Sequence, residues 1–320
     1  MNKITTNCFI FNIYILTFQQ DGFMNIFTNA HFLLTLTSLF WAFNTIAGRA
    51  AVDEVSPLLV VSVRWFFVSI ILTFLCRKEL IATWKVLKNR LKWLVIMGLF
   101  GFTSFNSFYY IAAHDTIAIN LGLVQGTMPA FIIIISRFWL KEHINLPQLF
   151  GVLITFFAVL LVVSSGDPYA LLKLQLNKGD IVMIFACTLY AVYAVGLRKK
   201  PKIGALALLT FFSYVAFLGS LPGLFYEAFS NTLILPGIKG VIVLSVIIIF
   251  PSFLAQIFFM KGVEKIGPAR SGLYTNLVPV FASILAVILL GELFKLYHLI
   301  SLILIFIGIY MFEKKRIQFD

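Results

Sequence analysis

Ten long, predominantly apolar stretches follow one another along this chain, and they constrain its fold more than any other feature. A helix needs about 20 mostly apolar residues to cross the hydrocarbon core of a membrane. Hydrophobic residues fill 61% of the 320 positions and charged residues only 12%, a balance that a water-soluble globule could not bury. We therefore expect an all-α integral membrane protein with ten transmembrane helices. The expected spans are residues 31–50, 57–76, 91–113, 117–138, 146–163, 180–197, 205–227, 239–260, 270–290 and 296–312.

The connectors between these spans are too short to form a soluble domain. Residues 1–30, before the first span, are a segment of open status, because more than one interpretation fits them. Its apolar part, residues 4–18, is short for a span, and no clear small-residue cleavage site marks a signal peptide. We interpret residues 1–30 as a translation start placed too early, with residues 1–23 outside the mature protein, or as a peripheral N-terminal segment. An eleventh span is the alternative.

Lysine and arginine predict the orientation in the membrane. If both ends of a ten-span chain are cytoplasmic, nineteen of the 25 basic residues fall on the cytoplasmic side, five fall on the other side, and Arg64 lies inside a span. Short cytoplasmic loops carry such an excess of basic residues. The formal net charge of +12 is then explained by loops that lie against anionic lipid headgroups, and it requires no nucleic acid partner.

The two halves of the chain repeat one another at an offset of 150 residues. Phe100 aligns with Phe250, and the glycine, proline and glutamate pairs are harder to obtain by accident. These pairs are Gly122 and Gly272, Pro129 and Pro279, and Glu142 and Glu292. Because five spans is an odd number, the second half would enter the membrane upside down. Two inverted five-helix repeats are a recurring architecture of secondary transporters, with the solute bound near the midplane between them.

Two segments carry a resemblance to a known family. Tyr110–Glu142 (YIAAHDTIAINLGLVQGTMPAFIIIISRFWLKE) resembles the signature of the EamA-type transporters of the drug/metabolite transporter superfamily, and Gly262–Glu292 is similar to a second copy of it. The resemblance implies two five-span EamA-like repeats, at 31–165 and 178–313. It also implies a transporter of a small organic metabolite, with efflux across a bacterial cytoplasmic (inner) membrane as the expected direction and place.

Polar side chains that share one helical face inside the spans are the candidates for lining a solute path. Intramembrane polar groups face the bundle interior or a wet cavity, because lipid cannot satisfy them. Trp41 and Asn44 share such a face in the first span, and Asn106 and Gln256 occupy equivalent positions in the two halves. Hydrogen bonding between helices is the alternative explanation for these groups. The expected solute-binding residues are Trp41, Asn44, Arg64, Asn106, Gln125, Tyr190, Tyr193, Gln256, Thr275 and Asn276.

Pro129 and Pro279 are expected to kink the fourth and ninth spans and to act as hinges. A proline within a helix removes the hydrogen bond to the carbonyl four residues earlier. The carbonyls of Gln125 and Thr275 should therefore be free at equivalent places. A bend that serves only helix packing is the alternative.

Arg64 is the cation that lies deepest within an expected span, and Glu142 and Glu292 lie at corners between spans. An intramembrane cation indicates a functional site by default, so Arg64 could attract a carboxylate on the solute. It could equally bond helix carbonyls or reach the interface. A carboxylate close to a helix start satisfies free N–H groups, which favours a structural role for both glutamates.

The sequence lacks the signatures of catalysis. It carries no phosphate-binding loop, no HExxH and no GxSxG, and its four histidines share no metal-ligand spacing. We expect no enzyme activity, no catalytic or metal-binding residues and no cofactor. The expected partners are a small-molecule solute and membrane lipid, and a homodimer is a possible assembly. No acidic residue lies in the middle of an expected span, which favours exchange or uniport over proton coupling. A channel and a non-transporting membrane protein remain the alternatives.

Overall fold

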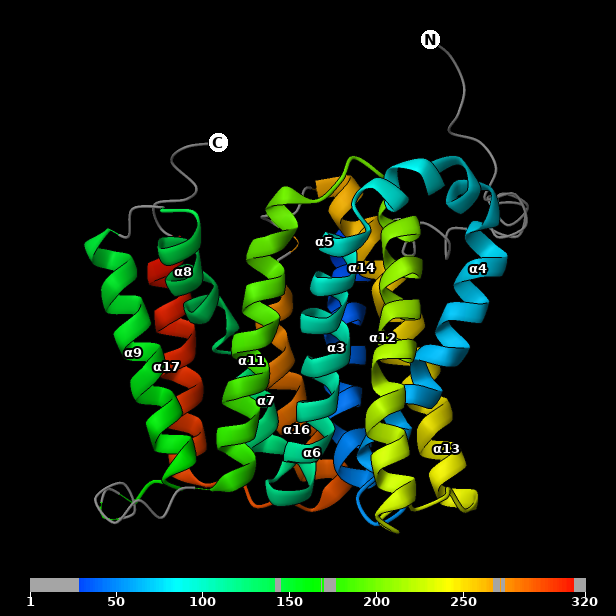
Figure 1. The fold of residues 1–320 in the computed structure, drawn as a ribbon. Helices are drawn as coiled ribbons and strands as arrows, with labels where there is room; N and C mark the ends of the chain where they lie inside the picture. The colour runs from blue at the N-terminus through cyan, green and yellow to red at the C-terminus, as the bar shows by residue number, and fades with distance from the viewer. Residues whose placement is uncertain are drawn as a thin grey trace, which may run out of the picture.

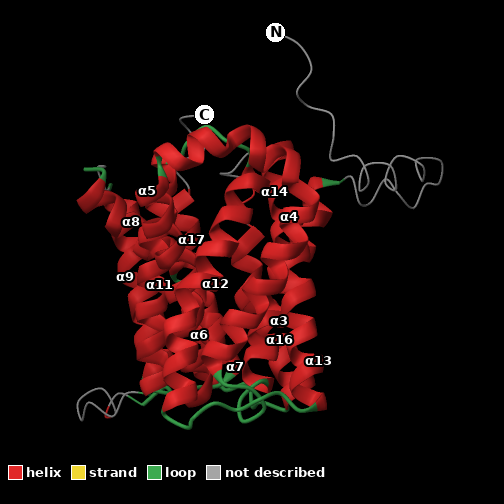
Figure 2. Ribbon diagram, turned by 45° about the vertical axis from the view of Figure 1, so that its right-hand side comes forward, coloured by secondary structure: helices red, strands yellow, loops and turns green. Residues whose placement is uncertain are grey.

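The computed structural model describes residues 29–141, 145–167, 169, 177–266, 271 and 274–313, and these residues form a helical bundle without β-strands. Residues 1–28, including most of the segment of open status, lie outside the described residues. The helices stand side by side between two faces (Figures 1 and 2). We call the face where α3 begins and α17 ends the upper face, and the face where α3 ends and α17 begins the lower face.

The first half of the chain forms seven described α-helices and one π-helical turn. Its elements are α3 (Ala30–Ala50), α4 (Pro57–Asn89), α5 (Leu91–Gly98), a π-helical turn (Leu99–Ser104), α6 (Phe105–Asp115), α7 (Ala118–Gln125), α8 (Met128–Trp139) and α9 (Leu146–Val163). Asparagine caps begin two of them. The side chain of Asn29 accepts backbone N–H groups at the start of α3, and Asn145 forms a capping box with Gln148 at the start of α9.

The second half follows the same pattern. Its elements are α11 (Lys178–Gly196), a 3-10 turn (Leu197–Lys199), α12 (Ala205–Phe229), α13 (Ile238–Ile247), a π-helical turn (Ile248–Leu254), α14 (Ala255–Ile266), a 3-10 turn (Thr275–Leu277), α16 (Val278–Leu290) and α17 (Leu296–Glu313). The two π-helical turns overlap almost completely when the chain is shifted by 150 residues. The repeat in the sequence is therefore also a repeat in backbone geometry.

Among the described residues, seven helical stretches are long and apolar enough to cross a membrane. They are Ala30–Ala50, Pro57–Asn89, Leu91–Asp115, Ala118–Trp139, Lys178–Lys199, Ala205–Phe229 and Ile238–Val263. Three shorter apolar helices accompany them: Leu146–Val162, Thr275–Leu290 and Leu296–Met311. Large apolar side chains such as Phe74 and Phe138, each 81% exposed, cover the outside of the bundle. Such a surface fits lipid rather than water.

The expected connector at residues 77–90, between the second and third spans, is instead largely helical, because α4 continues to Asn89. This stretch contains no glycine or proline and is rich in good helix formers, so nothing ends the helix at Cys76. Most of its side chains are exposed, and in Figure 1 it crosses the upper face towards α5. The second expected span is therefore correct in place but shorter than the helix that contains it.

Each of the two prolines lies where the regular α-helical hydrogen bonding is interrupted. Helix α7 ends at Gln125, and Pro129 lies in the first turn of α8; Pro279 lies in the same position of α16, after the 3-10 turn. The expected free carbonyl of Thr275 is wrong, since it accepts the backbone N–H of Val278. The 3-10 turn supplies this bond one residue closer than an α-helix would.

The halves interlock through equivalent pairs of helices. Helix α3 packs on α14 and α16, and its counterpart α11 packs on α6, α7 and α8. Helices α4 and α12 pack together, as do α9 and α17. Helices α3 and α11 run in opposite directions between the two faces (Figure 1). The inner helices therefore each contact the opposite half of the chain.

Candidate functional site

Arg64 is the centre of a polar cluster inside the bundle and is only 4% exposed. Its Nε donates to the hydroxyl of Ser252 at 2.9 Å. Its Nη1 donates to Asn106 Oδ1 at 2.9 Å and to the Tyr110 hydroxyl at 2.6 Å, and lies 3.3 Å from Asn44 Oδ1. We call these five residues the Arg64 cluster.

Each member of the Arg64 cluster is held in place by a further bond. The amide of Asn106 donates to the carbonyl of Phe102 at 2.6 Å, which turns its oxygen towards the arginine. The Tyr110 hydroxyl donates to Asn44 Oδ1 at 2.7 Å, and Ser252 donates to the carbonyl of Ile247 at 2.5 Å. The cluster therefore presents oriented oxygens to the guanidinium, so little rearrangement is needed to keep it there.

The two π-helical turns help to bring these groups together. Ser252 lies within the second turn, and Asn106 follows the first turn by two residues. A π-helical turn adds one residue to the helical turn and often occurs at functional sites. It also redirects the side chains that follow. Both halves of the chain thus contribute to the Arg64 cluster through the same backbone device.

The cluster holds a positive charge without a carboxylate partner among the described residues. All four hydrogen-bond partners are neutral, and the ion pair between Lys239 and Glu54 lies at the lower face, away from Arg64. A buried cation without a counter-ion is costly. A solute carboxylate would supply the missing charge, and arginine binds carboxylates through well-oriented, charge-assisted hydrogen bonds.

A run of aromatic rings leads from Arg64 to α11, with Trp65 packed on Phe102 at 5.1 Å. The guanidinium carbon of Arg64 lies 4.9 Å from the centroid of the Trp65 ring. On α11, the rings of Tyr190 and Tyr193 are 5.5 Å apart and pack against Phe105 and Phe102 respectively. These rings form an aromatic shell on one side of the cluster, and such rings can contact the apolar part of a solute.

The structure brings three of the expected solute-binding residues together: Asn44, Arg64 and Asn106. The others lie in different surroundings. Trp41 packs on the ring of Phe259 at 5.3 Å, and Gln256 is half-buried on α14, so that Ser252 rather than Gln256 is the second-half side chain on Arg64.

The remaining expected residues lie near the proline breaks. Gln125 ends α7, and its Oε1 is buried without a hydrogen-bond partner among the described residues. Thr275 and Asn276 lie in the 3-10 turn before α16, where Asn276 is 8% exposed. No bond to Arg64 is formed by these three residues in the described part of the chain.

Two buried carboxylates escaped the sequence analysis. Asp180, at the start of α11, is fully buried and accepts bonds from Thr116 (2.5 Å) and from the amide of Asn120 (3.0 Å). Glu227 accepts the backbone N–H groups of Leu58 and Leu59 at the start of α4. Both carboxylates lie at the ends of expected spans, and their partners lie in the other half of the chain. Helical periodicity within one span does not reveal such contacts.

The expected helix cap by Glu292 exists, although the helix it caps is in the first half. Its two carboxylate oxygens accept the backbone N–H groups of Ala118 at 2.7 Å and Ile119 at 3.0 Å, at the start of α7. Such a contact stabilises free N–H groups and the positive end of the helix dipole. Glu142, its counterpart in the repeat, lies outside the described residues.

Comparison with known proteins identifies the family. Residues 28–164 and residues 177–313 each match the model of the EamA-like transporter family. The chain belongs to the EamA-like transporter family. It is therefore an integral membrane transporter of a family whose members are transporters rather than enzymes, and the resemblance seen in the sequence is confirmed.

Several relatives of this EamA-like transporter carry the same general description. The uncharacterized transporters YyaM and YetK of Bacillus subtilis (strain 168) are each 26% identical, over 256 and 286 residues. The match to YyaM covers 78% of this chain and 82% of YyaM, and the match to YetK covers 87% of this chain and 84% of YetK. An uncharacterized transporter of Archaeoglobus fulgidus is 26% identical over 303 residues, 91% of this chain and 99% of the relative.

A solved crystal structure has the same fold. It superimposes with a TM-score of 0.61 at 18% sequence identity and covers 91% of this EamA-like transporter and 99% of its own chain. At this identity the likeness concerns the arrangement of helices and nothing finer.

Proposed function

We propose that this chain is a secondary transporter that moves a small organic solute with a carboxylate, amino-acid-like or otherwise amphipathic, by alternating access. The observation that carries the proposal is the buried Arg64, held by neutral groups from both halves of the chain. A carboxylate that enters the cluster would neutralise the guanidinium. The aromatic shell would contact the rest of the solute.

The architecture that we propose is a ten-helix bundle of two inverted five-helix repeats, residues 31–165 and 178–313. Support comes from the equivalent helix pairs and from the π-helical turns at matching places. If the repeats rock against one another, the contacts at one face open while those at the other close. The helix breaks at Pro129 and Pro279 are the proposed hinges, because a broken helix bends there without losing further backbone bonds.

We place the protein in a bacterial cytoplasmic membrane with both termini in the cytoplasm, and we propose efflux as its direction. The bias of lysine and arginine supports this orientation. The proposed partners are the solute and membrane lipid, and no nucleic acid. The proposal is compatible with a monomer or a homodimer. In this orientation the upper face is cytoplasmic.

The test is flux in vesicles of purified protein, with a panel of radiolabelled amino acids and the matching amino-acid amides, which lack the carboxylate. We expect saturable exchange that prefers the acids, and we expect Arg64→Gln to remove the preference. Arg77→Gln, at an exposed position on the upper face, is the matched control and should keep it.

Three outcomes would contradict the proposal. Flux that rises linearly with solute concentration would indicate a channel. The absence of binding and flux across the panel would indicate a protein that does not transport these solutes. A preference for acids that survives Arg64→Gln would remove Arg64 from the site.

A further inference from the structure

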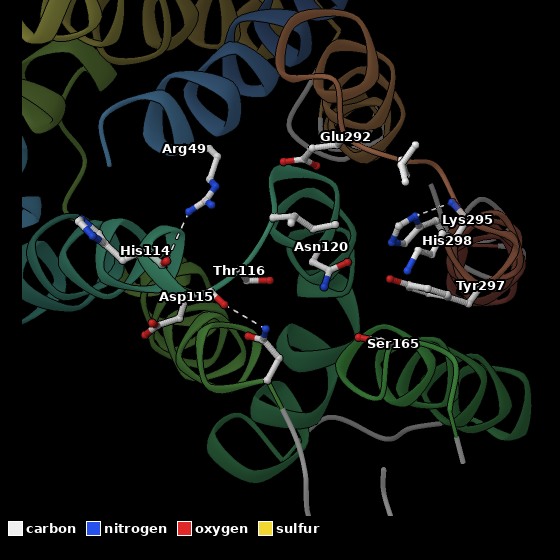
Figure 3. A pocket seen from close by; sticks show the side chains of 13 residues that line it. Arg49, His114, Asp115, Thr116, Asn120, Ser165, Glu292, Lys295, Tyr297 and His298 are labelled. Atoms are coloured by element: carbon white, nitrogen blue, oxygen red, sulfur yellow. Dashed lines mark hydrogen bonds between the residues drawn. The ribbon is translucent and has the colours of Figure 1, made fainter. Parts of the chain in front are cut away.

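A second polar site lies at the lower face, away from the Arg64 cluster. It is a cavity of about 410 Å³ between the two halves of the chain. Thr116 and Asn120 line it from the first half, and Glu292, Tyr297 and His298 line it from the second half (Figure 3). Its volume falls within the range of small-molecule sites, roughly 300–1,000 Å³.

Two buried side chains in this cavity have polar atoms without a hydrogen-bond partner among the described residues. They are Asn120, which is 4% exposed, at its Oδ1, and His298, which is fully buried, at its Nε2. In Figure 3 these two atoms point towards one another across the cavity. A buried polar atom left unsatisfied costs about 1–3 kcal/mol, so both atoms favour an occupant.

The other hydrogen bonds of His298 and Asn120 determine whether each unpaired atom is a donor or an acceptor. The backbone N–H of Lys295 donates to His298 Nδ1 at 3.0 Å. Because Nδ1 accepts, the neutral imidazole carries its proton on Nε2, which is therefore a donor. The Asn120 amide nitrogen donates to Asp180 at 3.0 Å, so its Oδ1 is an acceptor. One donor and one acceptor thus face the same space.

We propose that this cavity is a second solute site, which binds small uncharged or zwitterionic molecules through a hydroxyl or carboxamide group. Either group accepts a hydrogen bond from His298 and donates one to Asn120 at the same time. A carboxylate cannot donate and an ammonium cannot accept, so neither satisfies both atoms. The site does not depend on the transport proposed above.

The charges around the cavity agree with a solute of no net charge. Arg49 and Lys295 oppose Asp115 and Glu292 along its lining. Two of these charges are already engaged: Arg49 donates to the carbonyl of Ala113 at 2.8 Å, and Glu292 caps α7. The lining is therefore balanced, and an ion entering the cavity would gain little.

The test measures protection of an introduced cysteine in the full chain, reconstituted in lipid nanodiscs. Leu293 lines the cavity and is 76% exposed, so Leu293→Cys should react with a hydrophilic maleimide. Ile238→Cys, at an 85% exposed position of the lower face outside the cavity, is the control. The described native cysteines, Cys76 and Cys187, are buried, and the parent chain measures the remaining background.

L-Serine and L-alanine are the matched probes, since they differ only by the hydroxyl. We expect L-serine to slow the labelling of Leu293→Cys and not of Ile238→Cys, and L-alanine to require a roughly tenfold higher concentration. In the Leu293→Cys background, His298→Phe should remove the protection. His298→Gln should retain it, because its amide nitrogen can donate from a similar position.

The proposal is overturned if L-serine gives no protection, which would leave water as the occupant. It is also overturned if both amino acids protect equally, or if protection survives His298→Phe. Should His298→Phe fail to fold, the comparison of the two amino acids on Leu293→Cys alone decides. Arg64→Gln separates the two sites, since it should change acid selectivity in flux and leave this protection in place.

Discussion

At the scale of single residues, the choice of asparagine around Arg64 is informative. Asn44 and Asn106 present oxygens at 3.3 and 2.9 Å from Nη1, the distances at which aspartate would form an ion pair. Neutral acceptors hold the guanidinium in place and leave its charge uncompensated. This arrangement supports the proposed role of Arg64, because its positive charge is not neutralised by these partners.

Asn44→Asp tests this arrangement with an almost isosteric change. The new carboxylate would keep the bonds to Arg64 and Tyr110 and would neutralise the cation. We expect thermal stability to be kept or raised, while exchange of acidic solutes falls by about tenfold or more, as for the loss of one charge-assisted bond. Flux and thermal unfolding of the same preparations are the measurements.

Asn145→Asp is the control for Asn44→Asp. It adds the same charge at the start of α9, where aspartate caps a helix as well as asparagine does. Thermal stability and the exchange of acidic solutes should both stay near those of the parent chain. Equal acid flux in Asn44→Asp and the parent chain would contradict the role of Arg64.

Part of the Arg64 cluster could be predicted from the sequence. The cost of polar groups in lipid selects Arg64, Asn44 and Asn106 without any knowledge of the fold. Ser252 could not be chosen over Gln256 in the same way. The π-helical turn adds one residue to the helix and changes which side chains face the bundle, and regular helical spacing does not reveal it.

At the scale of elements, two helix starts at the lower face are stabilised by carboxylates from the opposite half. Glu292 caps α7 and Glu227 caps α4, each with both oxygens. The sequence predicted a structural role for Glu292, but not its partner, because the contact joins residues more than 170 positions apart. These contacts tie the halves together at one face.

Glu227→Ala should destabilise the protein by roughly 1–3 kcal/mol, since it leaves the N–H groups of Leu58 and Leu59 unsatisfied in a buried place. Glu54→Ala is the matched control. It removes the ion pair with Lys239, which is worth about 0–1 kcal/mol at the surface. Thermal unfolding in one detergent compares them, and an equal loss in both variants would refute the cap.

Close approach of α7 to α16 is a second property of the elements. A β-carbon added at Gly122 would lie 2.7 Å from that of Ala282, too near for two methyl groups. Gly122→Ala should therefore cost roughly 1–3 kcal/mol through overpacking. Gly237→Ala, where no atom lies within 4 Å of the added carbon, is the control and should unfold close to the parent temperature.

At the scale of the whole molecule, the composition determines the class of fold, whereas the sequence repeat indicates how its parts pair. Ten apolar stretches predicted helices in the right order, and every described helix lies within or next to one of them. The helical end of α4 and the breaks at the prolines could not be predicted from apolarity, because hydropathy reports burial in lipid and not where backbone bonds end.

The orientation of the whole chain can be tested on a single helix. Lys178 and Lys199 bound one continuous stretch of 22 residues, which is about 33 Å long at 1.5 Å per residue and matches the hydrocarbon thickness. Cysteines replacing these exposed lysines should react from opposite sides of the membrane with an impermeant maleimide. Lys239→Cys should behave like Lys178→Cys in intact cells, and Lys265→Cys like Lys199→Cys in inverted vesicles, because each pair shares a face of the bundle. Reaction of Lys178→Cys and Lys199→Cys from the same side would mean that this helix does not cross the membrane, and it would exclude two inverted five-span repeats.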